Sequence, residues 1–349
     1  MTVTSRLHNL DYLRGLAASS IMFYHFTTWS FGEYDADTLI RRIGIYGVAI
    51  FYVLSGLTLY HVYFKKLFIT ETLPSFFKKR VLRIFPLLWL ATLATIVLNL
   101  ESPDITKLAL NLSGLFGLVA WDKYFAVGAW SIGNELVFYL LFPFFIIIAR
   151  YSKMLFLACS LLFLVIYTVF AFQILDPSVE LSLQWKNYVN PLNQAFLFLG
   201  GFAIGLYIEN QKVSFPATLF LLAAGFALFI LYPASGDASQ LVTGFARLTF
   251  TLSCFLICAG FYKIELSATN LITKILEIAG KSSYSIYLLH PLVWGVAGFI
   301  LARTNTGSSH LMTIKQVVAV AITFIVSYFV YEKFEKYFMK LGNRKVPGK

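Results

Sequence analysis

The stretch Leu10-Asp11-Tyr12-Leu13-Arg14-Gly15-Leu16-Ala17, which continues to Phe23-Tyr24-His25-Phe26, places Arg14 and His25 inside the first apolar segment of the chain. Ionisable side chains are costly in the hydrocarbon core of a membrane, so they indicate a functional site there. Eleven residues of α-helix rise about 16 Å and make nearly whole turns, so both side chains would share one face. The segment predicts a membrane helix with one polar group near its end and another at depth.

The composition is that of an integral membrane protein. The chain has 349 residues, of which 58% are hydrophobic and 13% charged, and its mean hydropathy is +0.74, far from the usual values of soluble domains. We predict an all-α, polytopic membrane bundle, a single domain over residues 1–340 followed by a short basic cytoplasmic tail, 341–349. Ten stretches are long enough to cross a bilayer, roughly 10–30, 45–63, 84–100, 132–149, 154–174, 191–209, 215–232, 243–262, 283–302 and 312–332.

The distribution of basic residues predicts the topology. An additional apolar stretch, 108–120, is short and contains Asn111 and Gly114, so we expect a re-entrant or interfacial piece. Leaving it out puts both termini, and most of the 28 Lys and Arg residues, on one side. By the positive-inside rule that side is cytoplasmic. The net charge of +11 then reflects this bias and attraction to anionic lipid, and it is no evidence for nucleic-acid binding.

Two features commonly sought in such a chain are not predicted. The first apolar segment is interrupted by Arg14 and His25 and shows no small-residue cleavage site, so we expect no removable signal peptide. The three cysteines, Cys159, Cys254 and Cys258, lie in apolar stretches without metal-type spacing. We therefore predict neither a disulfide nor a metal site.

A basic run precedes the third span on the predicted cytoplasmic side. It contains Lys78, Lys79, Arg80 and Arg83 and ends at Pro86. Residues three apart are neighbours on a helix, and two guanidinium groups at that spacing suit phosphate groups. Lys78 and Lys79 also fit a simple anchor to lipid headgroups. Arg80 and Arg83 are therefore candidate ligand-binding residues.

A second polar group enters a span from the opposite side. Ser131, Glu135 and Tyr139 recur every four residues after Trp130, so they share a helix face. Glu135 and His25 would lie at similar depth, and an intramembrane carboxylate needs a partner. A histidine oriented by a carboxylate can act as a general base, but the same contact could simply pin two helices together.

Three weaker patterns remain open. The small residues of Gly47–Gly56 allow close helix packing. His290, followed by Pro291, could line a donor channel or mark a helix kink. Arg247 stands alone within a span, where it could bind an acidic group or pair internally.

Taken together, the motifs resemble the acyltransferase 3 family of membrane proteins. Five blocks match in order along the chain: Arg14 to His25, Gly47 to Gly56, the Arg80/Arg83 block ending in Pro86 and Trp89, Trp130-Ser131 with Glu135 and Phe138-Tyr139, and Ser283-Tyr284-Ser285 with His290-Pro291. Two positions depart from the pattern, since Tyr52 and Leu88 stand where Phe and Tyr are commoner. The esterase-like domain that some relatives carry after the bundle is not expected here.

The resemblance implies a bundle of about ten membrane helices and transfer of an acyl group from a cytoplasmic donor, typically acetyl-CoA, to a carbohydrate hydroxyl. The essential arginine and histidine of the family fall on Arg14 and His25, its second arginine pair on Arg80 and Arg83, and its Trp-Ser…Glu motif on Trp130, Ser131 and Glu135.

We accordingly predict an O-acetyltransferase of the bacterial inner (plasma) membrane. His25 and Glu135 are expected to be catalytic, and the substrate-binding residues to be Trp130, Ser131, Tyr139 and His290. Arg14, Arg80 and Arg83 are expected to hold the acyl-CoA, which is a co-substrate, and no cofactor is expected to be bound permanently. The expected partners are the lipid bilayer, a carbohydrate acceptor that can be lipid-linked, and polysaccharide assembly proteins.

Alternatives remain at this stage. The acceptor could be a small molecule such as an antibiotic, or the reaction could be succinyl transfer to a glucan. A proton-coupled secondary transporter also places ionisable residues in mid-membrane. A non-catalytic scaffold would leave the buried charges unexplained.

Overall fold

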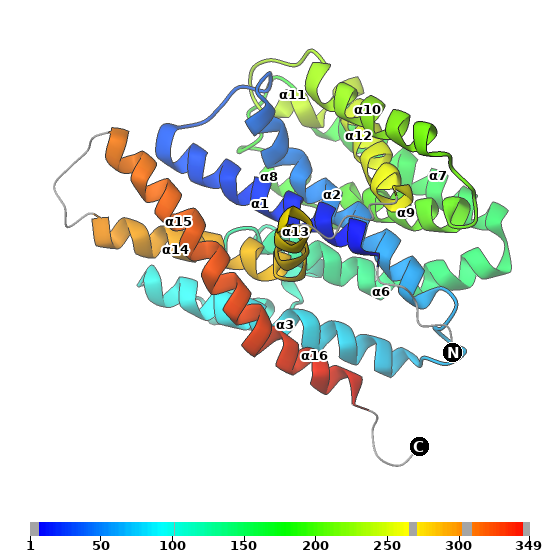
Figure 1. The fold of residues 1–349 in the computed structure, drawn as a ribbon, viewed down its shortest axis with the longest axis horizontal. Coiled ribbons are helices and arrows are strands. Elements are labelled where there is room, and N and C mark those ends of the chain that lie inside the picture. Colours follow the sequence, from blue (N-terminus) through cyan, green and yellow to red (C-terminus); the bar gives the residue numbers. More distant parts are fainter. Residues whose placement is uncertain (1–6, 101, 265–270, 302–308, 345–349) are drawn as a thin grey trace.

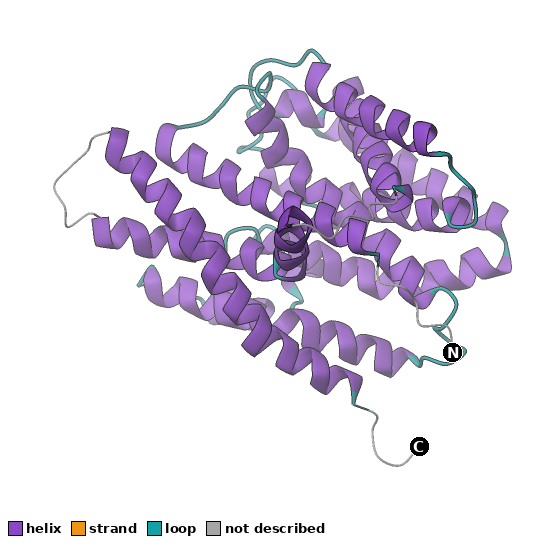
Figure 2. Cartoon of the chain, viewed as in Figure 1, coloured by secondary structure: helices purple, strands orange, loops and turns teal. Residues whose placement is uncertain are grey.

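The structure, a computed structural model, describes residues 7–100, 102–264, 271–301 and 309–344. Within these ranges the chain is helical and forms no strand (Figure 2). The helical segments are α1 (His8–Phe31), α2 (Leu39–Tyr63), α3 (Leu73–Leu98), α4 (Ile105–Ser113), α5 (Phe116–Val119), α6 (Ala129–Tyr151), α7 (Lys153–Val169), η1 (Phe170–Ile174), α8 (Trp185–Tyr188), α9 (Pro191–Ile208), α10 (Phe215–Leu231), α11 (Ser239–Val242), α12 (Gly244–Lys263), α13 (Leu271–Lys281), α14 (Ser283–Leu301), α15 (Ser309–Val330), η2 (Tyr331–Glu335) and α16 (Lys336–Asn343).

The predicted all-α bundle is confirmed, and each of the ten predicted apolar stretches coincides with a long helix. Seven helical segments within the described ranges are long and apolar enough to cross a membrane, as judged by length and composition. The total of ten spans and the cytoplasmic side of both termini stay predictions. The short stretch 108–120 forms α4 and α5, nine and four residues long and separated by Gly114 at φ +75°. Neither is long enough to cross a bilayer.

Helices α2 and α9 form the centre of the bundle, where two glycines let their backbones approach. A Cβ atom on Gly56 would lie 2.0 Å from the carbonyl oxygen of Phe198, and one on Gly201 would lie 1.9 Å from that of Val53. Small residues are what allow such close contact between membrane helices. The packing role expected for the Gly47–Gly56 block is therefore seen at its last residue.

Helix α1 is held by α2, α13 and α14 (Figure 1). The contact with α13 depends on a second pair of glycines, because a Cβ on Gly280 would lie 2.1 Å from the carbonyl oxygen of Asp11, and one on Gly15 would lie 2.6 Å from the backbone nitrogen of Gly280. Helix α13 lies outside the ten predicted spans. This short amphipathic helix brings the start of α14 against the Arg14 end of α1.

The third predicted span begins earlier than expected. Helix α3 starts at Leu73, where the side chain of Thr72 accepts a hydrogen bond from the backbone N–H of Ser75 and Pro74 occupies the first turn, both typical of a helix start. The basic run is therefore helical, and Arg80 and Arg83 lie on its inner turns. The π-helical segment η2 packs with α16 beside α3 and carries Glu335 toward this run.

Candidate active site

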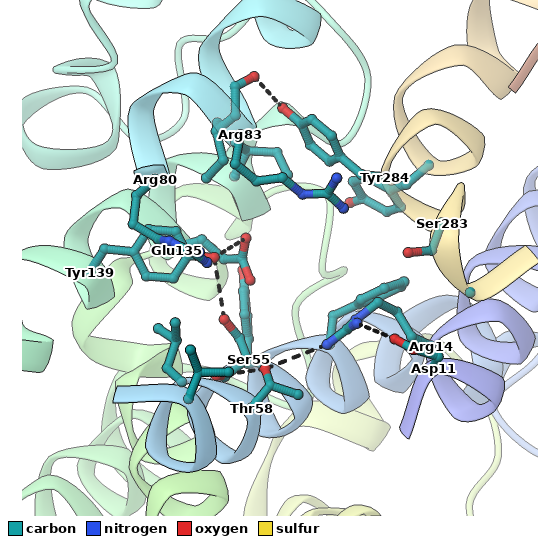
Figure 3. Close-up of a pocket in the computed structure, with 18 of the residues that line it drawn as sticks. Asp11, Arg14, Ser55, Thr58, Arg80, Arg83, Glu135, Tyr139, Ser283 and Tyr284 are labelled. Carbon is teal, nitrogen blue, oxygen red and sulfur yellow. Dashed lines mark hydrogen bonds and ion pairs between the residues drawn. The ribbon is translucent and has the colours of Figure 1, made fainter. Parts of the chain in front are cut away.

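A cavity of about 390 Å³ is lined by residues of α1, α2, α3, α6, α13 and α14. Its lining includes Arg14, Arg80, Arg83, Ser131, Glu135 and Tyr139, all candidates from the sequence. Figure 3 shows side chains from α1, α2, α3, α6 and α14 arranged around one space. The structure thus gathers six predicted site residues from three separate helices into a single chamber.

Arg14 already has a carboxylate partner on its own helix. Its Nη1 lies 3.1 Å from Oδ1 of Asp11, one turn earlier, and its Nη2 lies 3.5 Å from the hydroxyl of Thr58 on α2. The side chain keeps 24% of its surface exposed, so the guanidinium edge still faces the cavity. Asp11 therefore orients Arg14 without enclosing it.

Arg83 is more strongly neutralised. Its Nη1 lies 2.8 Å from Oε2 of Glu335, whose side chain is only 1% exposed, and its guanidinium lies 5.8 Å from the ring centroid of Tyr284. Ser285 donates a further hydrogen bond to Glu335. Glu335 was not among the predicted site residues, because an acidic residue directly after the last apolar stretch resembles an ordinary charge at the end of a membrane helix.

Arg80 differs from both. Its guanidinium lies over the rings of Tyr63 and Tyr139, at 5.5 and 5.9 Å from their centroids, and Nη2 is 3.4 Å from the Tyr63 hydroxyl. Its Nε is buried without a hydrogen-bond partner. Within the described part of the chain no carboxylate lies within 4 Å of Arg80. Arg80 is therefore the cavity arginine whose charge is least compensated, and it is best prepared to bind an anion.

The predicted face of α6 points into the same cavity. The Tyr139 hydroxyl donates to Oε2 of Glu135 at 3.1 Å and lies 3.4 Å from the Ser55 hydroxyl on α2. Ser131 lies deeper, where its hydroxyl is 2.9 Å from that of Tyr287. Trp130 is not part of the lining. It packs in an aromatic cluster whose ring neighbours are Tyr52, Trp185 and Tyr188.

The structure pairs His25 with a residue other than the expected one. Its Nδ1 lies 2.8 Å from Nε2 of His290, and no contact with Glu135 occurs among the described residues. The predicted partnership of His25 and Glu135 is therefore wrong, because Glu135 faces the arginines while His25 faces α14. The similar depth predicted for the two side chains is not seen either, since Glu135 lines the arginine chamber and His25 does not.

The histidine pair lies just beyond the inner end of the cavity. His25 and His290 are not among the lining residues, but the Tyr287 ring is. The centroid of that ring lies 6.2 Å from His290 and 5.9 Å from Phe51, another lining residue. The ring of Tyr287 therefore connects the lining of the chamber to His290, the hydrogen-bond partner of His25.

A smaller basic cavity of about 280 Å³ adjoins the mouth and shares Arg80 and Arg83 with the main one. It adds Lys66 and Lys79, and Lys79 lies 2.6 Å from Oε2 of Glu71. Burial alone would raise the pKa of the Glu71 carboxyl, but the hydrogen bonds from Lys79 and Ser75 together with the nearby lysines hold that pKa below its ordinary value. Glu71 is therefore ionised at neutral pH and orders the rim.

Comparison with known proteins shows to which family the chain belongs. The acyltransferase domain family matches residues 7–332, nearly the whole chain. The chain belongs to the acyltransferase 3 family. It is also 26% identical over 297 residues to a protein of Acidianus two-tailed virus named "Putative acetyltransferase ORF330", which covers 83% of this chain and 84% of the viral protein. No solved structure matches the chain. The protein is an acyltransferase built into a helical membrane bundle.

Proposed function

We propose that this acyltransferase moves an acetyl group from acetyl-CoA, bound at the cytoplasmic mouth of the cavity, to a hydroxyl of a surface or exported carbohydrate. The observation that carries the proposal is the chamber itself, where Arg14, Arg80 and Arg83 line one space that ends next to His25 and His290. CoA is a phosphate-bearing donor, and a cluster of guanidinium groups is the common protein solution for holding phosphates.

Arg80 is the main phosphate ligand in this proposal. Arg14 and Arg83 carry carboxylate partners, whereas Arg80 has aromatic contacts and one long hydrogen bond. A bound phosphate would supply the missing anion. Lys66 and Lys79 at the rim extend the positive surface outward, which would attract the donor from the cytoplasm.

The reacting end of the donor would extend along α1 toward His25. The interval from Arg14 to His25 corresponds to about 16 Å of helix rise, so binding and chemistry occupy different depths. In the proposal His25 takes the proton of the acceptor hydroxyl, whose oxygen attacks the thioester carbon. Ser131 and Tyr287 lie at the inner end of the cavity, where both hydroxyls have the backbone carbonyl of Gly128 as an acceptor. In the proposal one of these hydroxyls turns to donate to the developing oxyanion.

Glu135 and Tyr139 have a supporting role in this arrangement. The Glu135 carboxylate faces the chamber that holds Arg14 and Arg80, and Tyr139 both bonds Glu135 and lies under Arg80. Together they would fix the arginines before the donor arrives. Trp130 and its aromatic neighbours would hold the start of α6, and through it Ser131, in place.

The proposal includes the bacterial inner membrane as the site of action, because an acceptor on an exported carbohydrate and a cytoplasmic donor meet there. The test is the O-acetyl content of the surface polysaccharide, measured by proton NMR in a deletion strain carrying wild type, His25→Ala or empty vector. We expect acetyl signals only with wild type. Identical spectra from all three strains would exclude surface O-acetylation by this protein.

A further inference from the structure

Three groups form a continuous hydrogen-bonded chain that ends at His25. The backbone carbonyl of Ile286 lies 3.0 Å from Nδ1 of His290, and Nε2 of His290 lies 2.8 Å from Nδ1 of His25. His290 is 1% exposed. Among the described residues, Nε2 of His25 has no hydrogen-bond partner. This nitrogen is not fully buried, so another group can reach it.

The chemistry of these atoms fixes where the protons lie. A carbonyl oxygen only accepts hydrogen bonds, so Nδ1 of His290 carries a proton and donates it to Ile286. In a neutral imidazole the other nitrogen then has a free lone pair. Nε2 of His290 is thus an acceptor, and Nδ1 of His25 carries the proton between the two rings. This leaves the lone pair of His25 on Nε2.

If His290 carried protons on both nitrogens, its Nε2 could no longer accept a hydrogen bond from His25. The groups around the ring disfavour this charged form. No carboxylate of the described residues lies within hydrogen-bond reach of either ring, and a buried cation without a counter-ion is strongly disfavoured. The neutral form of His290 is therefore the one that the site accommodates.

The fold restrains both rings. His290 follows Ile286 by one helix turn and precedes Pro291, which has no N–H to donate to the carbonyl of Tyr287 and so loosens the helix locally. The rings of His25 and His290 are nearly parallel, at 13°, with centroids 5.0 Å apart, and Trp29 stacks on His25 at 6° and 5.0 Å. Phe26 meets the edge of His290 at 5.9 Å. Rotation of either imidazole would disturb these contacts.

We propose that His290 is a positioning residue that holds His25 in the tautomer with a proton on Nδ1 and a free lone pair on Nε2. The role resembles that of a carboxylate behind a catalytic histidine, but a neutral ring anchored to a backbone carbonyl performs it. The catalytic role of His290 rests on the proposed function. The tautomer of His25 does not, because it is a property of the resting protein.

The reaction step balances as follows. Nε2 of His25 accepts the proton of the acceptor hydroxyl while that oxygen bonds to the thioester carbon. The Nδ1–H of the resulting imidazolium continues to donate to His290. When the carbon–sulfur bond breaks, the proton on Nε2 passes to the thiolate of CoA, and His25 returns to its starting tautomer. His290 neither gains nor loses a proton.

Two amide variants of His290 separate this role from packing. The amide of Gln reaches the place of Nε2 in histidine, so His290→Gln can still offer an acceptor to His25. The amide of Asn reaches only the place of Nδ1, so His290→Asn cannot. General-base catalysis contributes about 10²–10⁴-fold to a rate. We expect kcat to fall at least about 100-fold in His290→Asn and no more than about 10-fold in His290→Gln, with KM for acetyl-CoA unchanged in both.

Nitrogen-15 NMR of histidine-labelled wild type tests the tautomer directly, because the chain has five histidines and His25→Ala identifies the signal. We expect a protonated Nδ1 and an unprotonated Nε2 in His25, even if His290→Asn fails to fold. A protonated Nε2 in neutral wild type would overturn the inference. The inference would also be overturned if folded His290→Asn had the kcat of wild type while His25→Ala was inactive. That result would not contradict the proposed function. The predicted tautomer without acetyl transfer by wild type would refute the function alone.

Discussion

Arg83 on α3 and Glu335 on η2 form an ion pair at 2.8 Å in which the carboxylate is almost fully buried. The pair joins residues far apart in the sequence and ties the last helical segments to the rim of the cavity (Figure 3 shows Arg83 facing that space). Ser285 adds a hydrogen bond from α14. One buried carboxylate therefore connects three helical segments at the mouth.

Removing the charge of Arg83 and removing that of Glu335 should lower the stability of the protein by different amounts. Arg83→Gln would leave Glu335 buried without a counter-charge and should destabilise the protein by about 3–5 kcal/mol. Glu335→Gln leaves Arg83, whose side chain is 24% exposed and can be reached by water, so the loss of stability should be smaller. Thermal unfolding of both variants in the same detergent measures the difference. Equal, small losses would mean that the pair does not hold the tail segments in place.

Arg80 should control donor binding. We expect Arg80→Ala to weaken CoA binding by about 10–100-fold, because hydrogen bonds to charged groups are worth about 1.5–3 kcal/mol. Lys78→Ala is the matched control, since Lys78 lies on the same helix but not in the cavity lining. Isothermal titration with CoA compares the two. Unchanged affinity in Arg80→Ala would remove Arg80 from the donor site.

Glu135→Gln separates a supporting role from a chemical one. If Glu135 fixes the arginines through Tyr139, the variant should raise KM for acetyl-CoA several-fold with little change in kcat. Steady-state kinetics on both substrates provide the comparison, and Tyr139→Phe should behave in the same direction. A large drop in kcat at constant KM would instead place Glu135 at the reacting atoms.

Arg42, at the opposite end of α2, should contribute to stability and not to catalysis. Its buried guanidinium donates to the carbonyl oxygens of Phe229, Ile230 and Tyr232 at the carboxyl end of α10, and to that of Ala36. These are the carbonyls that a helix end leaves without partners. Arg42→Gln should cost about 2–4 kcal/mol of stability without changing the rate per folded molecule.

The control for this change is Lys65→Gln, because Lys65 is 70% exposed and Glu209, its partner, keeps the hydrogen bond from Tyr60 without it. Ion pairs with an exposed partner contribute at most about 1 kcal/mol, so the unfolding temperature of Lys65→Gln should stay close to that of wild type. An Arg42→Gln protein as stable as Lys65→Gln would show that the cap of α10 is dispensable.

Much of the fold follows from the sequence because membrane helices depend on length and hydropathy, which are local properties. The ten apolar stretches are all helical, and the stretch 108–120 forms two helices too short to cross a bilayer. Helix α13 was missed because its apolar residues form only one face of a short segment. Its position depends on the contact between Gly15 and Gly280, which no local pattern reveals.

Most residues of the candidate site could be predicted from the sequence, but which side chains contact each other could not. Arg14, Arg80, Arg83, Ser131, Glu135 and Tyr139 were found from charge and spacing, and they do meet in one cavity. The partners of His25 and Arg83 were not found, because helix rotation and tertiary contact determine which side chains face each other. His290 was noted as a channel residue or a kink, and its contact with His25 became visible only once α1 and α14 were placed together.

The role of His25 is tested by the transfer of labelled acetyl groups from acetyl-CoA into the carbohydrate fraction, measured together with CoA binding in the same inverted membrane vesicles. For His25→Ala we expect loss of transfer with CoA binding within about twofold of wild type, because donor binding and chemistry lie about 16 Å apart on α1. Wild-type transfer by His25→Ala would show that His25 does not carry out the chemistry.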